Sequence, residues 1–77
     1  MKVLLLEDDS SLGATLKDRL DKEGLNTTWV TTLNSARQEI KKINFNLIIL
    51  DVGLPDGSGF EFSKEVRKNN NCPFIFV

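Results

Sequence analysis

Residues 47–59 read LIILDVGLPDGSG. Four apolar residues are followed at once by an acid, Asp51, and the next eight positions contain three glycines and one proline. A short apolar run is typical of a buried strand, and clustered glycine and proline indicate a loop. The stretch therefore predicts a buried strand that ends at a carboxylate and continues into a loop over residues 52–59.

The start of the chain has the same pattern. Residues 3–6 (VLLL) are apolar and are closed by three acids at positions 7–9, which predicts a strand buried on both faces. Residues 26–30 (NTTWV) have strand propensity, and residues 74–77 (FIFV) form a further apolar run. The sequence therefore predicts four strands.

Helical periodicity separates these strands. After the first strand, leucine recurs every four positions between a candidate N-cap, Asp9 or Ser10, and a candidate stop at Gly24. The stripe of this first helix consists of Leu12, Leu16 and Leu20. The stripe of the second helix, at offsets of three, four and three, consists of Leu33, Ala36, Ile40 and Ile43.

A third helix is expected after the glycine-rich loop. We expect Ser58 to cap it, Phe62 and Val66 to be buried, and the asparagines at 69–71 to end it. Strands that alternate with helices imply parallel strands with helices on both faces, joined by right-handed crossovers. The predicted fold class is α/β, a flavodoxin-like doubly wound parallel sheet with strand order 2-1-3-4.

The composition excludes several classes of protein. Ten basic and eleven acidic residues leave a formal charge of −1, which does not indicate a general binder of nucleic acid or membrane surfaces. One cysteine, Cys72, and no histidine exclude an internal disulfide and a Cys/His zinc site. The apolar start is too short for a signal-peptide core or a membrane span. We therefore expect a cytoplasmic protein without membrane contact.

Four acids stand where ligands bind in such sheets, beyond the carboxyl ends of the strands. Glu7, Asp8 and Asp9 follow the first strand, and Asp51 follows the third. Carboxylates that share a crevice repel each other, so we expect a raised pKa or a bound cation. Ligands that are all oxygen favour a hard cation, and Mg²⁺ suits a site that also takes phosphate. Asp51 could then attack a phosphoryl group and form an acyl phosphate.

Residues 4–9 (LLLEDD), residues 47–55 (LIILDVGLP) and Gly59 resemble the receiver domain of two-component response regulators. Either acidic segment alone is weak evidence, but the two together, at this separation and with the loop glycine and proline, are specific. The resemblance covers the whole chain and about two-thirds of a usual receiver domain. It implies that residues 1–77 are an incomplete receiver, truncated after the fourth strand, without the last helices and the fifth strand.

The resemblance also implies a role for each matching residue. Asp51 corresponds to the phosphorylated aspartate and is also a metal ligand. Asp8 would bind Mg²⁺ directly and Glu7 partly through water, while the backbone carbonyl of Gly53 would complete the protein ligands. These four residues are the predicted site.

Other positions match less, or not at all. Pro55 and Gly59 match residues that shape the loop after the acceptor, whereas Asp9 has no family role and is interpreted as a solvated helix cap. Trp29 is interpreted as a packing group. Receivers also carry a Ser or Thr after the fourth strand and a Lys after the fifth, and neither falls within these 77 residues. We therefore expect a complete metal site without a complete switch.

The resemblance implies a signalling module and not an enzyme, with autocatalysed phosphotransfer from a sensor histidine kinase as its only chemistry. The opening LLEDD, residues 5–9, is common among receivers joined to winged-helix DNA-binding domains. It implies a transcription regulator that contacts DNA only through an output domain absent from these residues. The last strand, if exposed, would allow a homodimer or strand-edge self-association.

Three alternative functions compete with the receiver interpretation. A pseudo-receiver or assembly fragment would use the fold only for interaction. Mg²⁺-dependent phosphotransferases and nucleases, among them haloacid-dehalogenase-like phosphatases and the topoisomerase-primase domain, normally need Asp-x-Asp, where this chain has Gly53 two residues after Asp51. A nucleotide-binding flavodoxin-like domain is disfavoured because the acids at 7–9 stand where a glycine-rich phosphate loop would be.

Overall fold

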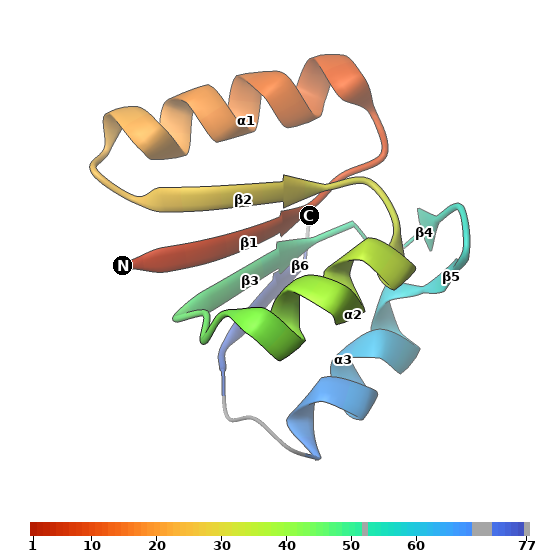
Figure 1. The fold of residues 1–77 in the computed structure, drawn as a ribbon. Helices are drawn as coiled ribbons and strands as arrows, with labels where there is room; N and C mark the ends of the chain where they lie inside the picture. Colours follow the sequence, from red (N-terminus) through yellow and green to blue (C-terminus); the bar gives the residue numbers. More distant parts are fainter. Residues whose placement is uncertain (52, 69–71, 77) are drawn as a thin grey trace.

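The structure is a computed structural model and describes residues 1–51, 53–68 and 72–76. The strands of the main sheet alternate with helices along the chain (Figure 1). The elements are β1 (Lys2–Leu6), α1 (Ser10–Lys22), β2 (Asn26–Val30), α2 (Leu33–Lys42), β3 (Leu47–Leu50), β4 (Gly53–Leu54), β5 (Gly57–Ser58), α3 (Gly59–Arg67) and β6 (Phe74–Phe76). No described helix is both long and apolar enough to cross a bilayer.

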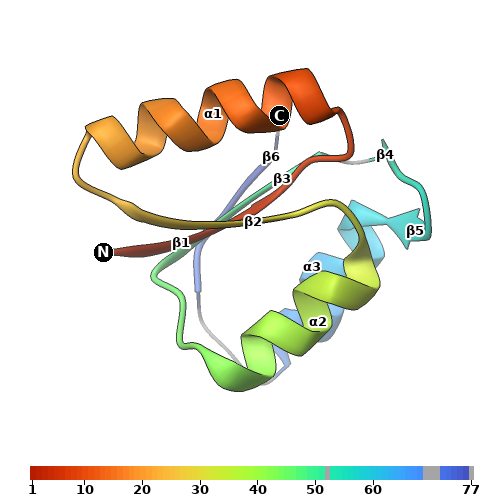
Figure 2. The same cartoon turned by 45° about the horizontal axis from the view of Figure 1, so that its top comes forward.

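The main sheet has four parallel strands in the order β2-β1-β3-β6. Because β6 is the fourth strand of this sheet along the chain, the predicted order 2-1-3-4 and the flavodoxin-like fold class are confirmed. Helix α1 covers one face of the sheet, and α2 and α3 cover the other (Figures 1 and 2). The winding therefore reverses between β1 and β3, and their carboxyl ends meet at one edge.

The predicted burial of the first strand on both faces is confirmed, since residues 3–6 are all 0% exposed. In β3 only Ile48 and Leu50 are fully buried, while Leu47 and Ile49 are partly covered. The buried pair joins the core under α2 and α3, whereas α1 packs mainly over β2 and β1. The main core cluster consists of Leu4, Leu6, Leu33, Ala36, Phe45, Ile48, Leu50, Leu54, Phe62, Val66 and Cys72.

Helix α1 shows how the tertiary structure changes a predicted face. Asp9 is its N-cap, and Gly24 follows it with φ +87°, as the sequence predicts. Of the three leucines of the predicted stripe, Leu16 and Leu20 are partly buried, whereas Leu12 is 46% exposed. The buried residue of α1 is Gly13 instead, and a Cβ there would lie 2.2 Å from Cζ2 of Trp29. The indole occupies the space beneath the first turn, which agrees with a packing role for Trp29.

The loop predicted for residues 52–59 contains a small antiparallel hairpin, β4–β5, where Gly53 pairs with Ser58. Gly57 has φ +151°, a conformation that glycine adopts without strain. Ser58 occupies the N-cap position of α3 as predicted, but its side chain makes no capping hydrogen bond. Phe62 and Val66 are buried as predicted. The predicted helix end at residues 69–71 lies outside the described residues.

Candidate functional site

The parallel register places the predicted site at the carboxyl edge of β1 and β3. Leu6 pairs with Leu50, so the residues after them, Glu7 and Asp51, lie side by side. The N–H of Asp51 donates to the carbonyl of Leu6 at 3.2 Å, and the N–H of Glu7 donates to the carbonyl of Val30 at 3.0 Å. Backbone hydrogen bonds to neighbouring strands therefore hold both acids.

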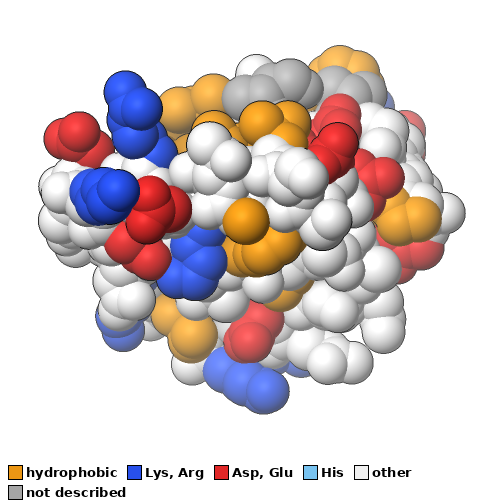
Figure 3. All heavy atoms as spheres, turned by 90° about the horizontal axis from the view of Figure 1, so that it is seen from above, with side chains coloured by type: hydrophobic (Ala, Val, Ile, Leu, Met, Phe, Trp, Pro, Cys, Tyr) orange, Lys and Arg blue, Asp and Glu red, His pale blue; other side chains and the backbone are white. Residues whose placement is uncertain are grey.

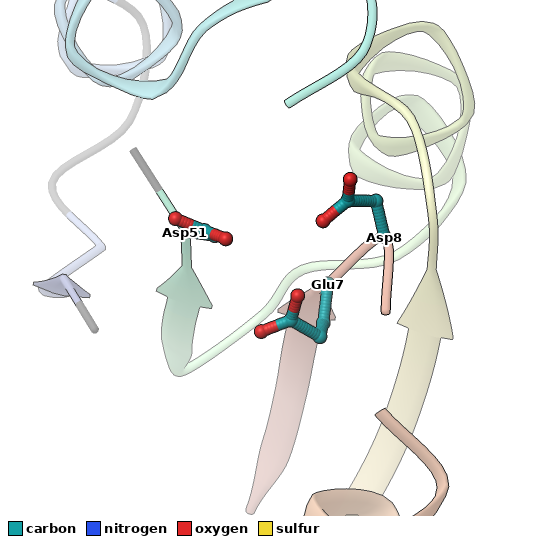
Figure 4. A group of neighbouring side chains, drawn as sticks. All are labelled: Glu7, Asp8 and Asp51. Carbon is teal, nitrogen blue, oxygen red and sulfur yellow. The ribbon is translucent and has the colours of Figure 1, made fainter. Parts of the chain in front are cut away.

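Glu7, Asp8 and Asp51 each offer one carboxylate oxygen, and these oxygens lie within 4.8 Å of one another. The carboxylates of Asp8 and Asp51 point toward the space between the two strand ends (Figure 4). Glu7 is only 2% exposed, Asp51 is half-buried and Asp8 is exposed. The structure thus brings together the three side chains predicted to bind metal. Donors that are all carboxylate oxygen suit a hard divalent cation such as Mg²⁺.

The wider surface has the same charge bias. Figure 3 looks down on α1 and shows acidic side chains at both ends of this face; those at the right-hand end, where the strands of Figure 1 terminate, have few basic side chains among them. Many of the basic side chains visible on this face lie toward the other end. A cation would therefore meet a favourable potential at the site.

Glu7 is the buried member of the cluster. Burial raises the pKa of Glu7 above its ordinary value, and the charges of Asp51 and Asp8 raise it further. The hydrogen bond from the N–H of Asp9 to Oε2 of Glu7, at 3.2 Å, acts in the opposite direction. The predicted raised pKa is therefore present, and it arises because a carboxylate is held away from water beside other carboxylates.

Asp9 lies outside this cluster. Its Oδ1 accepts a hydrogen bond from the N–H of Leu12 at 3.0 Å, which makes it the side-chain cap of α1. Its exposed side chain agrees with the interpretation as a solvated helix cap.

Gly53 lies two residues after Asp51, and its N–H donates to Oδ1 of Asp51 at 3.3 Å. This contact helps to orient the Asp51 carboxylate. A Cβ at Gly53 would meet nothing within 4 Å, so packing does not demand glycine here. The role of its carbonyl as a metal ligand stays a prediction.

Asp56 is a positioning residue that the sequence did not reveal. Its Oδ1 accepts from the N–H of Leu33 at 2.8 Å and its Oδ2 from the N–H of Asn34 at 3.0 Å. These two backbone N–H groups belong to the first turn of α2, and the first is the main reason why the pKa of Asp56 lies below its ordinary value. The carboxylate thus ties the loop after Asp51 to a helix N-terminus. Its partners are more than 20 residues away in sequence, so no local pattern indicates them.

Among solved structures, the non-phosphorylated HemR receiver domain from Leptospira biflexa is 39% identical, with a TM-score of 0.89. That match covers 97% of this chain and 61% of the other. The chemotaxis response regulator CheY4 of Vibrio cholerae is 29% identical with a TM-score of 0.93, and the match covers 97% of this chain and 65% of that one.

Curated proteins give the same result. The chain is 34% identical over 76 residues to the sensory transduction protein BceR of Bacillus subtilis (strain 168), which covers 99% of this chain and 33% of that protein. It is 32% identical over 77 residues to the response regulator protein GraR of Staphylococcus epidermidis, which covers 100% of this chain and 34% of that protein. The chain therefore spans about a third of the length of these relatives.

The family model for the response regulator receiver domain matches residues 3–77, nearly the whole chain. The sheet order, the three carboxylates at its switch point and these similarities agree with one another. This chain belongs to the response regulator receiver domain family.

Proposed function

We propose that Asp51 accepts a phosphoryl group from a sensor histidine kinase in a Mg²⁺-dependent reaction. The observation that supports this most is the meeting of three carboxylates, from Glu7, Asp8 and Asp51, at the switch point of a receiver fold. A carboxylate cluster without a cation would be self-repelling, so its presence favours a site built for a metal.

Glu7, Asp8 and Asp51 would hold the ion, together with the backbone carbonyl of Gly53. When bound, Mg²⁺ would screen the repulsion between the acceptor carboxylate and an anionic phosphoryl donor. Because these donors are oxygen atoms on two adjacent strand ends, the chain itself provides the rigid part of the site.

Asp51 is the nucleophile in this proposal. An oxygen of its carboxylate attacks phosphorus, and a new O–P bond forms as the bond between phosphorus and the ring nitrogen of the kinase phosphohistidine breaks. The electron pair of that broken bond stays on the ring nitrogen, and Asp51 becomes an acyl phosphate. The hydrogen bond from the N–H of Gly53 orients the carboxylate before attack.

Intact mass spectrometry tests the proposal. The chain is incubated with Mg²⁺ and a small acyl phosphate, in parallel with Asp51→Asn and with Asp9→Asn as a matched control. We expect one added phosphoryl group in the parent and in Asp9→Asn, because Asn is also a good cap and Asp9 lies outside the cluster. Asp51→Asn should take none, because its amide is a poor nucleophile.

Equal labelling of Asp51→Asn and the parent would disprove the assignment of the acceptor. Labelling that persists in excess chelator would disprove the metal requirement. If no variant is labelled, the pseudo-receiver alternative gains support, and the same assay on a longer chain that includes the family's Ser or Thr and Lys decides between a receiver in shape only and one that needs them.

We further propose that the chain is part of a transcription regulator and contacts DNA only through another domain. One relative, 32% identical over 76 residues, is named the uncharacterized transcriptional regulatory protein YvcP of Bacillus subtilis (strain 168). The isolated chain should not shift any DNA fragment in a gel, and a shift at physiological salt would contradict this division of roles.

Self-association through β6 is a separate proposal. Within the described part of the chain, β6 is the outermost strand beside β3, and its Ile75 and Phe76 are 48% and 38% exposed. Phe60 lies beside Phe76 with ring centroids 4.9 Å apart and is 52% exposed. Apolar surface beside an unpaired edge favours pairing with another copy. A folded chain that sediments strictly as a monomer at high concentration would contradict the proposed self-association.

A further inference from the structure

Trp29 contacts the backbone of the acidic site. It belongs to β2, where it pairs with Leu5 of β1, and its indole Nε1–H donates to the carbonyl of Glu7 at 3.0 Å. The side chain thus extends past the end of β1 to the peptide that joins Glu7 to Asp8. These two residues provide two of the three carboxylates of the site.

The backbone of Glu7 is held on both sides by β2. Its N–H donates to the carbonyl of Val30 at 3.0 Å, and its carbonyl accepts from Trp29. The first bond continues the ladder between the strands, whereas the second is made by a side chain beyond the ladder. Loss of the second bond would leave the peptide between Glu7 and Asp8 free to rotate about its flanking single bonds.

Rotation of that peptide would redirect Asp8 more than Glu7. The side chain of Asp8 is exposed, so packing adds little to its direction, while Glu7 is 2% exposed and also accepts a hydrogen bond from the N–H of Asp9. The direction of the Asp8 carboxylate therefore depends on how firmly the preceding peptide is held.

The indole is itself fixed in place by α1. A Cβ at Gly13 would lie 2.2 Å from Cζ2, 2.3 Å from Cε2 and 2.6 Å from Nε1 of Trp29, so only glycine leaves room for the ring. Asp9, which caps α1, also accepts the N–H of Gly13 through its carbonyl at 2.8 Å. The first turn of α1 thus packs against the indole ring that donates a hydrogen bond to the carbonyl of Glu7.

We infer that Trp29 is a positioning residue for the divalent cation site, which acts by fixing the Glu7–Asp8 peptide and does not touch the ion. This inference rests on the proposed Mg²⁺ site. Pure packing by Trp29 would stabilise the fold but would not need the indole N–H. The hydrogen bond to the Glu7 carbonyl is the feature that distinguishes the two roles.

Trp29→Phe removes the N–H and keeps an aromatic ring, and Mg²⁺ affinity is measured by isothermal titration calorimetry. A net hydrogen bond is worth roughly 0.5–1.5 kcal/mol, so we expect the dissociation constant to rise about two- to tenfold. Val66→Ala, a core substitution in α3 away from the acids, is the control for lower stability alone. It should lower the melting temperature in chelator but leave the dissociation constant unchanged.

A second measurement uses the parent chain, so it does not depend on how the variant folds. Trp29 is the single tryptophan, and its ¹⁵N-labelled indole gives one N–H resonance. That resonance should move on addition of Mg²⁺ with the same dissociation constant as calorimetry. It should not move in Asp51→Asn/Asp8→Asn, which lacks two ligand carboxylates.

The outcomes separate the two proposals. If the parent binds Mg²⁺ but Trp29→Phe binds equally well, or as well as Val66→Ala, the role of Trp29 is refuted and the proposed function stands. A stationary indole resonance in a parent that saturates by calorimetry refutes it as well. If the parent binds no Mg²⁺ at all, both proposals fail.

Discussion

Substitution of Gly13 by alanine tests the close packing of α1 against the indole of Trp29, a contact that the sequence pattern of the helix does not predict. Gly13 is the fourth residue of α1, where alanine should stabilise the helix by about 1 kcal/mol if nothing else changed. The new methyl group, however, would overlap three ring atoms of Trp29, at 2.2, 2.3 and 2.6 Å. The indole has little freedom to move, because its Nε1–H is bonded to the carbonyl of Glu7.

The change in the free energy of unfolding caused by Gly13→Ala is the difference between these two opposing effects. Overpacking of a filled site typically costs about 1–3 kcal/mol, and an overlap with several atoms of a rigid ring belongs at the upper end. After subtraction of the helix gain, Gly13→Ala should lower the free energy of unfolding by about 1–2 kcal/mol. In a domain of this size each kcal/mol corresponds to about 4–8 °C in melting temperature.

Thermal and urea unfolding, followed by circular dichroism, provide the assay. Gly13→Ala is measured in the parent and in a Trp29→Val background, where the ring is gone. We expect the sign to reverse: destabilisation in the parent, and stabilisation by up to about 1 kcal/mol in the valine background. Ala14→Gly, at an exposed neighbouring position, calibrates the helix term in the same helix. Equal effects of Gly13→Ala in both backgrounds would refute the reasoning, as would a neutral effect in the parent.

Three further predictions concern the carboxylates. Glu7→Gln should raise the melting temperature in chelator, because burial and the neighbouring charges disfavour the ionised form of Glu7. The same variant should gain less stability from Mg²⁺ than the parent does. A lower melting temperature in chelator would contradict this prediction. Asp56→Asn should destabilise at neutral pH. The pKa of Asp56 in the folded protein lies below its ordinary value of 3.8. The extra stability of the parent over the variant should therefore be complete well above pH 3.8 and should disappear as the pH falls through that lowered pKa. A stability difference that does not depend on pH would contradict this prediction. Asp8→Ala should weaken Mg²⁺ binding more than Asp9→Ala does. Equal losses of Mg²⁺ affinity in calorimetry would mean that the pair of metal-binding acids is assigned one position away from its true place.

Local patterns were sufficient for the order and type of the main elements. Apolar runs closed by acids correspond to β1 and β3, and the N-cap Asp9 and the stop Gly24 bound α1 closely. These signals work because a strand or a helix end is decided by residues within a few positions of each other. The site followed from the same rules, since parallel strands place their carboxyl ends at one edge.

Contacts between distant segments cannot be predicted from such local patterns. Leu12 carries an apolar side chain at a position that fits the helical stripe, yet it is exposed, and β2 places the indole of Trp29 beneath Gly13. Asp56 looks like an ordinary turn residue between Pro55 and Gly57, and only the packed chain shows that it holds the first turn of α2.

The sequence by itself determined the alternation of strands and helices, the fold class and the identity of the acids at the strand ends. Only the tertiary structure decided how far each of these acids is buried and which groups hold them in place. The physical reason is range. Periodicity and capping act over a few residues, whereas the hydrogen bond from Trp29 to Glu7 and those from α2 to Asp56 join residues 22 or 23 positions apart. Such contacts exist only after the sheet has set the positions of its strand ends.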